Sequence, residues 1–354
     1  MCERRRTGWG ALVLLAIVSL GLTLSCKRER SNPDATSPIS DSSAPNDAAG
    51  RFCGVRLTAR LEKIVCADPR VKSLEPLSGM ISLRTLKLNG TAIRDLTPIE
   101  GLPLRVLQLK STNVIDLKPI AEMLKLRYLN LDRTEVADLR PLAALRELKF
   151  LYLSRTKVRD LSPLTATESL IWLDLSHAPI RGTESLRRFA KLRILDLSGR
   201  AIADLTGLSG LRELRMLDID HTPIESLAPL AKLTTLRSLD LTGTTKVRDF
   251  STLRGLTSLT DLKLGQTAFS DTTLLTALVR LEQLDLGRTK IADLRGLSSL
   301  KALRTLSLKG LELSDISVLF SLPKLRRLVV GDAKLPAGPI QQLLHKRPNL
   351  RLYQ

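Results

Sequence analysis

The feature that most constrains this chain is a leucine spacing that recurs about every 22 residues. The first leucines of successive units stand at Leu61, Leu83, Leu104, Leu126, Leu148, Leu170, Leu192, Leu214, Leu236, Leu259, Leu281, Leu303 and Leu325. The 264 residues from the first to the last of these hold twelve intervals, which gives the mean of 22. Only 3% of the residues are aromatic. The period therefore predicts an array of stacked small units and excludes a core built around aromatic rings.

Within one unit the apolar residues alternate with polar ones. Leu129 and Leu131 point to one side of an extended segment, whereas Tyr128, Asn130 and Asp132 point to the other, because side chains alternate along a strand. Each unit thus contains a short strand with one buried face. A single unit buries too little apolar surface to offset the entropy lost on ordering. The units are therefore expected to fold only as a continuous stack.

The unit from Leu126 to Leu142 reads L-x-x-L-x-L-x-x-T-x-V-x-D-L-x-P-L. This pattern resembles the 22-residue leucine-rich repeats of bacterial internalins and of phosphatase-regulatory repeat proteins, over residues 61–335. The resemblance implies an α/β solenoid, a leucine-rich-repeat horseshoe with a parallel sheet on the concave face and short helical or 3-10 turns on the convex face. By analogy of fold it also implies one alternative function, that of a regulatory subunit of an enzyme.

Two polar columns in the units are expected to be structural. An aspartate precedes Leu-x-Pro or a variant of it, and its carboxylate suits the start of a helical turn; the column is Asp95, Asp116, Asp138, Asp160, Asp204, Asp249, Asp293 and Asp315. A threonine column stands where the similar repeats often carry asparagine, and its hydroxyls can bond nearby backbone: Thr91, Thr112, Thr134, Thr156, Thr222, Thr244, Thr267 and Thr289.

The amino terminus has the features of a signal peptide, predicted at residues 1–25. Three arginines, Arg4 to Arg6, precede an apolar run of 16 residues, Trp9 to Leu24, which is shorter than the ~20 residues that a bilayer span needs. Leu22 to Cys26 resembles the lipobox of bacterial lipoproteins, which implies lipidation of Cys26. Lys27 in place of aspartate then implies the outer membrane of the cell envelope. An ordinary signal peptide with an unmodified Cys26 is the alternative.

The remaining boundaries follow from composition and period. Residues 26–50 are rich in Ser, Pro and Asp and are predicted to be a disordered tether. Residues 51–82 form the N-terminal cap and first repeat, 83–335 the further repeats, and 336–354 a C-terminal cap. Cys53 and Cys66 lie in the N-terminal cap and are expected to form a disulfide in an oxidising compartment. Two free buried thiols are the alternative.

One column on the side of the strands opposite the leucines is acidic. Asp174, Asp196, Asp218 and Asp240 follow each other on four successive units. Like charges on neighbouring strands destabilise each other, so strand propensity does not explain the run. We therefore expect a binding track for a cationic or hydroxyl-rich ligand. The alternative is a duplicated repeat whose aspartates pair with neighbouring arginines.

Aromatic side chains gather beside the acidic column. Tyr128, Phe150 and Trp172 occupy one position on three consecutive units, and Tyr152 lies next to them. These side chains are expected to be exposed, and such a cluster indicates a protein partner that covers them; packing among themselves is the alternative. The sequence thus favours a protein-binding module that docks its partner through Tyr128, Phe150, Tyr152, Trp172 and the four aspartates.

The charge balance suggests a second function class. Lys and Arg number 55 against 36 Asp and Glu, for a net charge of +19, and an arginine column precedes the strands: Arg84, Arg105, Arg127, Arg193, Arg215, Arg237, Arg304 and Arg326. Such a column could hold anionic glycans or lipopolysaccharide in an envelope structural protein. We expect no nucleic acid partner, because no dedicated module is present and the chain is predicted to be exported.

The sequence offers little for catalysis. His177 and His221 occupy equivalent positions two units apart, hence about 10 Å from each other, which is too far to share one metal ion. No nucleophile and base arrangement or phosphate-cradling glycine loop rises above the repeat. We therefore predict no enzyme activity, no cofactor and no metal site.

Overall fold

The computed structural model describes residues 50–199 and 202–354, all of which belong to one compact unit, Ala44–Gln354. The predicted signal peptide, the lipidation site Cys26 and the tether up to residue 49 lie outside the described residues. None of the described helices has the length and apolar character that a membrane span requires.

The repeats form a parallel sheet of fourteen strands in chain order. Its strands are β3 (Lys63–Val65), β4 (Thr85–Lys87), β5 (Val106–Gln108), β6 (Tyr128–Asn130), β7 (Phe150–Tyr152), β8 (Trp172–Asp174), β9 (Ile194–Asp196), β10 (Met216–Asp218), β11 (Ser238–Asp240), β12 (Asp261–Lys263), β13 (Gln283–Asp285), β14 (Thr305–Ser307), β15 (Arg327–Val329) and β16 (Arg351–Tyr353). The thirteen units read from the period supply β3 to β15. Neighbouring strands pair without register shift, so that Leu129 lies opposite Leu151 and Leu217 opposite Leu239.

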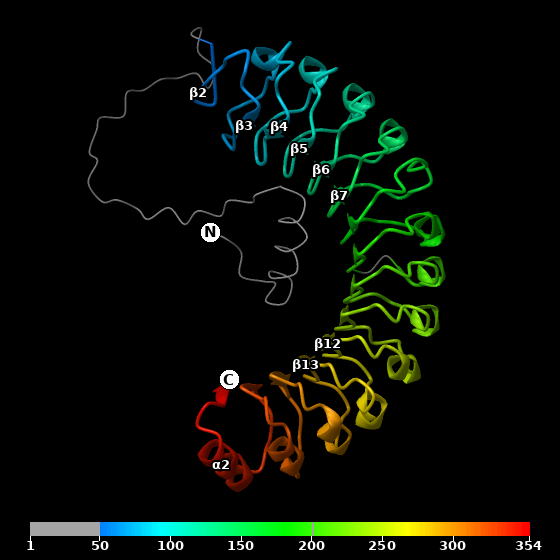
Figure 1. The fold of residues 1–354 in the computed structure, drawn as a ribbon, viewed down its shortest axis with the longest axis vertical. Helices are drawn as coiled ribbons and strands as arrows, with labels where there is room; N and C mark the ends of the chain where they lie inside the picture. The colour runs from blue at the N-terminus through cyan, green and yellow to red at the C-terminus, as the bar shows by residue number, and fades with distance from the viewer. Residues whose placement is uncertain (1–49, 200–201) are drawn as a thin grey trace, which may run out of the picture. The chain divides into compact units, whose positions relative to one another are not determined.

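Short 3-10 helices follow most strands and cover the other side of the leucine core. They are η1 (Glu75–Leu77), η2 (Thr97–Ile99), η3 (Lys118–Ile120), η4 (Arg140–Leu142), η5 (Glu184–Arg188), η6 (Thr206–Leu208), η7 (Ala228–Leu230), η8 (Ser251–Gly255), η9 (Thr272–Leu275), η10 (Arg295–Ser299) and η11 (Ser317–Ser321). Figure 1 shows the strands on the inner side of the arc and these helices on its outer side. The leucine-rich-repeat solenoid predicted from the sequence is confirmed.

Both structural polar columns behave as the sequence predicts. In all eight repeats named for the first column, the aspartate Oδ1 accepts a hydrogen bond from the backbone N–H two residues later, as Asp138 does from Arg140 at 2.9 Å. In the second column each threonine hydroxyl donates to the carbonyl three residues earlier, as Thr134 does to Leu131 at 2.7 Å. Both columns lie in the segment that follows a strand, where they satisfy backbone groups that the short elements leave free.

The leucine rows of all units merge into one apolar core that runs the length of the described solenoid. Its two ends are closed by elements outside the repeat. At the amino end a hairpin of β1 (Arg51–Phe52) and β2 (Val55–Arg56) precedes the first repeat strand, and a disulfide joins Cys53 to Cys66. At the carboxyl end the helix α2 (Ala337–Lys346) packs against the last repeat and is followed by β16. These caps cover apolar layers that would otherwise face water.

Candidate functional site

The four aspartates singled out from the sequence form one straight row on the sheet. Asp174 ends β8, Asp196 ends β9, Asp218 ends β10 and Asp240 ends β11, and each lies opposite the next in the strand register. We call these four residues the acidic ladder. Adjacent strands lie about 4.8 Å apart, so the ladder spans about 14 Å along the sheet.

Each ladder carboxylate takes part in the turn that follows its strand. The Oδ1 of each residue accepts a hydrogen bond from the backbone N–H two residues further on, over 2.9 Å at Asp174, 3.0 Å at Asp196, 3.1 Å at Asp218 and 2.9 Å at Asp240. Asn130 makes the same bond, with its amide oxygen 2.9 Å from the backbone nitrogen of Asp132. A neutral side chain can therefore supply the same turn bond as an aspartate, so the bond does not explain why four negative charges are aligned.

The ladder and the aromatic cluster are far less exposed than the sequence predicts. Trp172 is 6% exposed, Phe150 1% and Asp196 1%; Asp174, Asp218 and Asp240 are also buried, and only Tyr128 and Tyr152 are half-buried. The prediction that these side chains stand free on the surface is wrong. Strand alternation tells which side of the sheet a residue occupies, but it does not tell how deeply its neighbours cover it.

The aromatic side chains cover one another across the strands. Ring centroids lie 5.2 Å apart for Tyr128 and Tyr152, 5.3 Å for Tyr152 and Trp172, and 5.9 Å for Tyr128 and Phe150. Such spacings are those of favourable aromatic pairs. The rings thus pack among themselves, which is the alternative that the sequence left open. This packing accounts for the low exposure of Phe150 and Trp172. The cluster is thus a packed layer rather than a set of free anchors.

Crowding changes the protonation of the carboxyl groups. Burial, with the charges of Asp196 and Asp240 beside it, raises the pKa of Asp218 to about 9. Burial and the charge of Asp174 raise the pKa of Asp132 to about 6, and burial and Asp240 raise the pKa of Asp220. Each shift shows that the charged form lacks the solvation it would have in water.

A lysine closes one end of the ladder. The Nζ of Lys263 on β12 lies 2.7 Å from Oδ2 of Asp240. Burial lowers the pKa of Lys263, but the carboxylates of Asp240, Asp261 and Asp218 outweigh it, so the net shift is upward. The pair shows that a long cationic side chain can reach a ladder carboxylate at this depth and is stabilised there.

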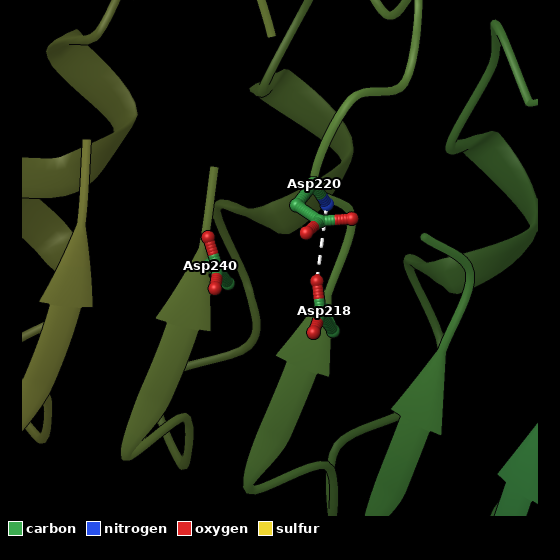
Figure 2. Close-up of side chains that lie close together, drawn as sticks. All are labelled: Asp218, Asp220 and Asp240. Atoms are coloured by element: carbon green, nitrogen blue, oxygen red, sulfur yellow. Dashed lines mark hydrogen bonds between the residues drawn. The ribbon is translucent and has the colours of Figure 1, made fainter. Parts of the chain in front are cut away.

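Three carboxylates converge at the middle of the site. Figure 2 shows Asp218 and Asp240 on neighbouring strands and Asp220 in the turn above them, with its backbone N–H bonded to Asp218. Asp218, Asp220 and Asp240 can each place one oxygen within 4.8 Å of the others. Carboxylate oxygens suit ammonium and guanidinium groups as well as hard metal ions. The arrangement can therefore hold positive charge.

Sequence reasoning did not single out Asp132, Asp220 or Lys263. Asp132 and Asp220 each stand two residues after the end of a strand. The units between them and the unit after Asp220 carry Ser or Thr there, namely Ser154, Ser176, Ser198 and Thr242. The spacing Asp218-Ile219-Asp220, read together with Asp240 one repeat later, was the available signal.

Comparisons with known proteins agree with the fold. A family model described as leucine-rich repeats in two copies matches residues 212–255. An internalin of Listeria monocytogenes is 26% identical, with a TM-score of 0.77 and coverage of 83% of this chain and 86% of that one. A leucine-rich-repeat protein of Leptospira interrogans is 16% identical, with a TM-score of 0.66 and coverage of 84% and 90%. No curated protein sequence matches the chain.

The chain contains leucine-rich repeats that fold as a solenoid, as the repeat match, the fourteen-stranded sheet and the likeness to these solved structures show. Its solenoid is similar to that of the Listeria internalin over most of both chains. The Leptospira likeness, at its lower identity, concerns the fold alone.

Proposed function

We propose that the solenoid is a non-enzymatic binding module for a protein partner, and that a lysine- or arginine-rich segment of the partner binds the acidic ladder. The observation that carries this proposal is the alignment of four aspartates in register where Asn130 fulfils the same turn role without charge. A sequence that needed only the turn would not concentrate like charges around Asp218, where they raise the pKa of its carboxyl group.

The charge distribution supports a basic ligand. The whole chain carries +19, so a cationic partner is repelled at long range and is attracted only where negative charge is concentrated. Local complementarity of this kind gives specificity more than raw affinity. The ladder with Asp132 and Asp220 provides such a concentration on the inner side of the repeat array.

The depth of the carboxylates supports long side chains as the binding groups. Asp218 and Asp240 are each 6% exposed, so a flat partner surface would not touch them. Lys263 already reaches Asp240 from the neighbouring strand. A lysine or arginine of the partner would approach Asp218 in the same manner, and leucine-rich-repeat arrays use their inner face as an extended binding surface.

An oligolysine peptide tests the proposal. We expect the full chain to bind a dye-labelled oligolysine in fluorescence anisotropy, with an affinity that falls as salt is added. The double variant Asp218→Asn, Asp240→Asn keeps both turn acceptors and should bind roughly tenfold more weakly or worse, because each lost charge-assisted contact removes about 1 kcal/mol or more.

A matched control replaces the same number of carboxyl groups outside the ladder. Glu135 and Glu225 are exposed and pair with Lys157 and Lys246 elsewhere on the solenoid. The double variant Glu135→Gln, Glu225→Gln also replaces two carboxyl groups by amides and should bind oligolysine like the parent. Equal affinity of the ladder variant and the parent would refute the proposed site.

We also propose that the module is anchored to the bacterial cell envelope through lipid on Cys26. The support is the lipobox-like segment Leu22-Thr23-Leu24-Ser25-Cys26. Expression in a bacterial host with radiolabelled palmitate should label the parent and not the Cys26→Ser variant. A parent chain that takes up no label would refute the anchor and leave the binding proposal untouched.

A further inference from the structure

A second charged site lies at the carboxyl end of the sheet and has the opposite sign. A groove with a volume of about 730 Å³ runs over β13 to β16. Its charged lining consists of Arg304, Arg326, Arg327, Arg351 and Glu282. Four guanidinium groups thus face one carboxylate. We call this place the arginine groove.

Duplication of the repeat does not explain this concentration of arginine. Arg304 and Arg326 belong to the column that precedes the strands in many units. Arg327 and Arg351, however, stand at the first strand position, where the preceding unit carries Thr305. Arg327 and Arg351 lie opposite each other in register, and like charges so placed destabilise a sheet.

The guanidinium groups are only partly neutralised from within the protein. Arg304 lies 3.3 Å from the carboxylate of Glu282, and the Nε of Arg327 donates to the hydroxyl of Thr305 over 3.1 Å. In residues 50–199 and 202–354 no ion pair within 4.0 Å involves Arg326 or Arg351. The groove therefore carries an excess of positive charge.

The carboxyl-terminal cap fixes one wall of the groove. Pro348 and Asn349 line it from the segment that follows α2. Arg347 holds this segment in place, because its guanidinium donates to the carbonyls of Phe320, over 2.6 Å, and of Leu322. The wall is thus tied to the last repeat and does not depend on a ligand for its position.

The rest of the lining indicates what kind of anion fits. Gln283, Thr305 and Asn349 offer neutral donors and acceptors, and Tyr353 offers a ring beside its hydroxyl. Several guanidinium donors suit a phosphate group, which presents three acceptor oxygens and up to two charges, better than a single carboxylate. Amide and hydroxyl groups with an aromatic ring suit the hydroxyls and the flat face of a sugar.

We propose that the arginine groove is a binding site for a phosphorylated saccharide. The phosphate lies against Arg326 and Arg351 with Arg327, and the sugar hydroxyls bond Gln283 and Asn349. This site is separate from the acidic ladder and does not depend on the function proposed for it. The same chemistry can reach the groove as a soluble sugar phosphate or as the phosphorylated sugar headgroup of a lipid.

Calorimetry on the full chain tests the site with inorganic phosphate, glucose 6-phosphate and glucose. Glucose 6-phosphate should bind more tightly than inorganic phosphate, and glucose should give no measurable heat. The double variant Arg326→Gln, Arg351→Gln should lose at least about tenfold in affinity for glucose 6-phosphate. Flotation with phosphatidylcholine vesicles, with and without phosphatidylinositol 4-phosphate, tests the lipid source.

The control removes the same charge from exposed arginines outside the groove. Arg105 and Arg237 are exposed members of the arginine column far from the groove, and the variant Arg105→Gln, Arg237→Gln should bind like the parent. The site is supported if the parent binds glucose 6-phosphate or the phosphoinositide vesicles and only the groove variant loses this binding. Which of the two ligands binds then identifies the source of the phosphorylated sugar. Binding of neither, equal loss in both variants, or equal affinity for phosphate and glucose 6-phosphate would overturn the proposal.

Discussion

Asp218 lies directly opposite Asp240 in the register of β10 and β11, and Lys263 contacts Asp240 from the next strand with a 2.7 Å ion pair. Each aspartate is held in place by a backbone N–H of the following turn. Because the turns fix the carboxyl groups, the charges cannot move apart. Their repulsion is relieved by protonation, as the pKa of Asp218 shows, or by a cation.

Stability should therefore depend on the ladder in a definite direction with pH. The pKa values of Asp218 and Asp132 in the folded chain, about 9 and about 6, lie above the ordinary value of 3.8. At pH values between 3.8 and these pKa values, the folded chain holds protons on the two carboxyl groups that the unfolded chain releases. The contribution of Asp218 and Asp132 to the free energy of unfolding therefore falls as the pH rises. The turn aspartates such as Asp138 have lowered pKa values, and their contribution is lost only below about pH 4.

The variant Asp218→Asn isolates this effect. Urea unfolding gives the free energy of unfolding of parent and variant at about pH 5 and about pH 8. The difference, variant minus parent, should be larger at the higher pH by roughly 1 kcal/mol or more. The exposed variant Glu225→Gln should show no such trend. The raised pKa of Asp218 would be contradicted if the free energy of unfolding of the parent rose between these pH values and that of Asp218→Asn changed with pH in the same way.

Trp172 should behave as a core residue. Because it is 6% exposed and packs against Tyr152, Trp172→Ala should lower the free energy of unfolding by about 3–5 kcal/mol. Its Nε1 is buried without a hydrogen-bond acceptor among the described residues. Because Trp172→Phe removes only a donor that makes no bond and keeps an aromatic ring, it should lower the free energy of unfolding much less than Trp172→Ala. Denaturant unfolding distinguishes this from a free surface anchor, whose removal would leave stability unchanged.

Gly207 should tolerate no side chain. A Cβ there would lie 1.8 Å from the carbonyl oxygen of Thr183 in the preceding repeat, so Gly207→Ala should cost about 2 kcal/mol or more through displaced backbone. A Cβ added at Gly210 would meet no atom within 4 Å, and Gly210→Ala is the matched control, with an expected change within about 1 kcal/mol. Similar melting temperatures for the two variants would show that the repeats are packed less closely than the structure indicates.

The Cys53–Cys66 disulfide should stabilise the amino-terminal cap. It joins residues 13 apart in sequence, and closing a loop of this size contributes about 3 kcal/mol. Reductant should lower the stability of the parent by that order and leave the variant Cys53→Ala, Cys66→Ala unaffected. A parent chain that is insensitive to reductant would contradict a stabilising role.

The period of the leucines was sufficient to predict the sheet, the outer turns and the roles of Asp138 and Thr134, because these features repeat with the backbone. It was not sufficient to predict how deeply Trp172 and Asp196 are covered, since this depends on the sizes of side chains on neighbouring strands. The arginine groove escaped prediction for a different reason. Arg327 and Arg351 meet only because the cap after α2 adds a strand that breaks the repeat.

Binding of a basic ligand at the acidic ladder is tested most directly by the pKa of Asp218 with and without that ligand. Carboxyl carbon resonances of the full chain, assigned through the Asp218→Asn variant, report this pKa in an NMR titration. We expect the pKa of Asp218 to lie well above the ordinary aspartate value in the free protein and to decrease clearly when oligolysine is bound, because a neighbouring cation favours the charged carboxylate. An ordinary pKa in the free protein, or one that oligolysine does not change, would contradict this expectation.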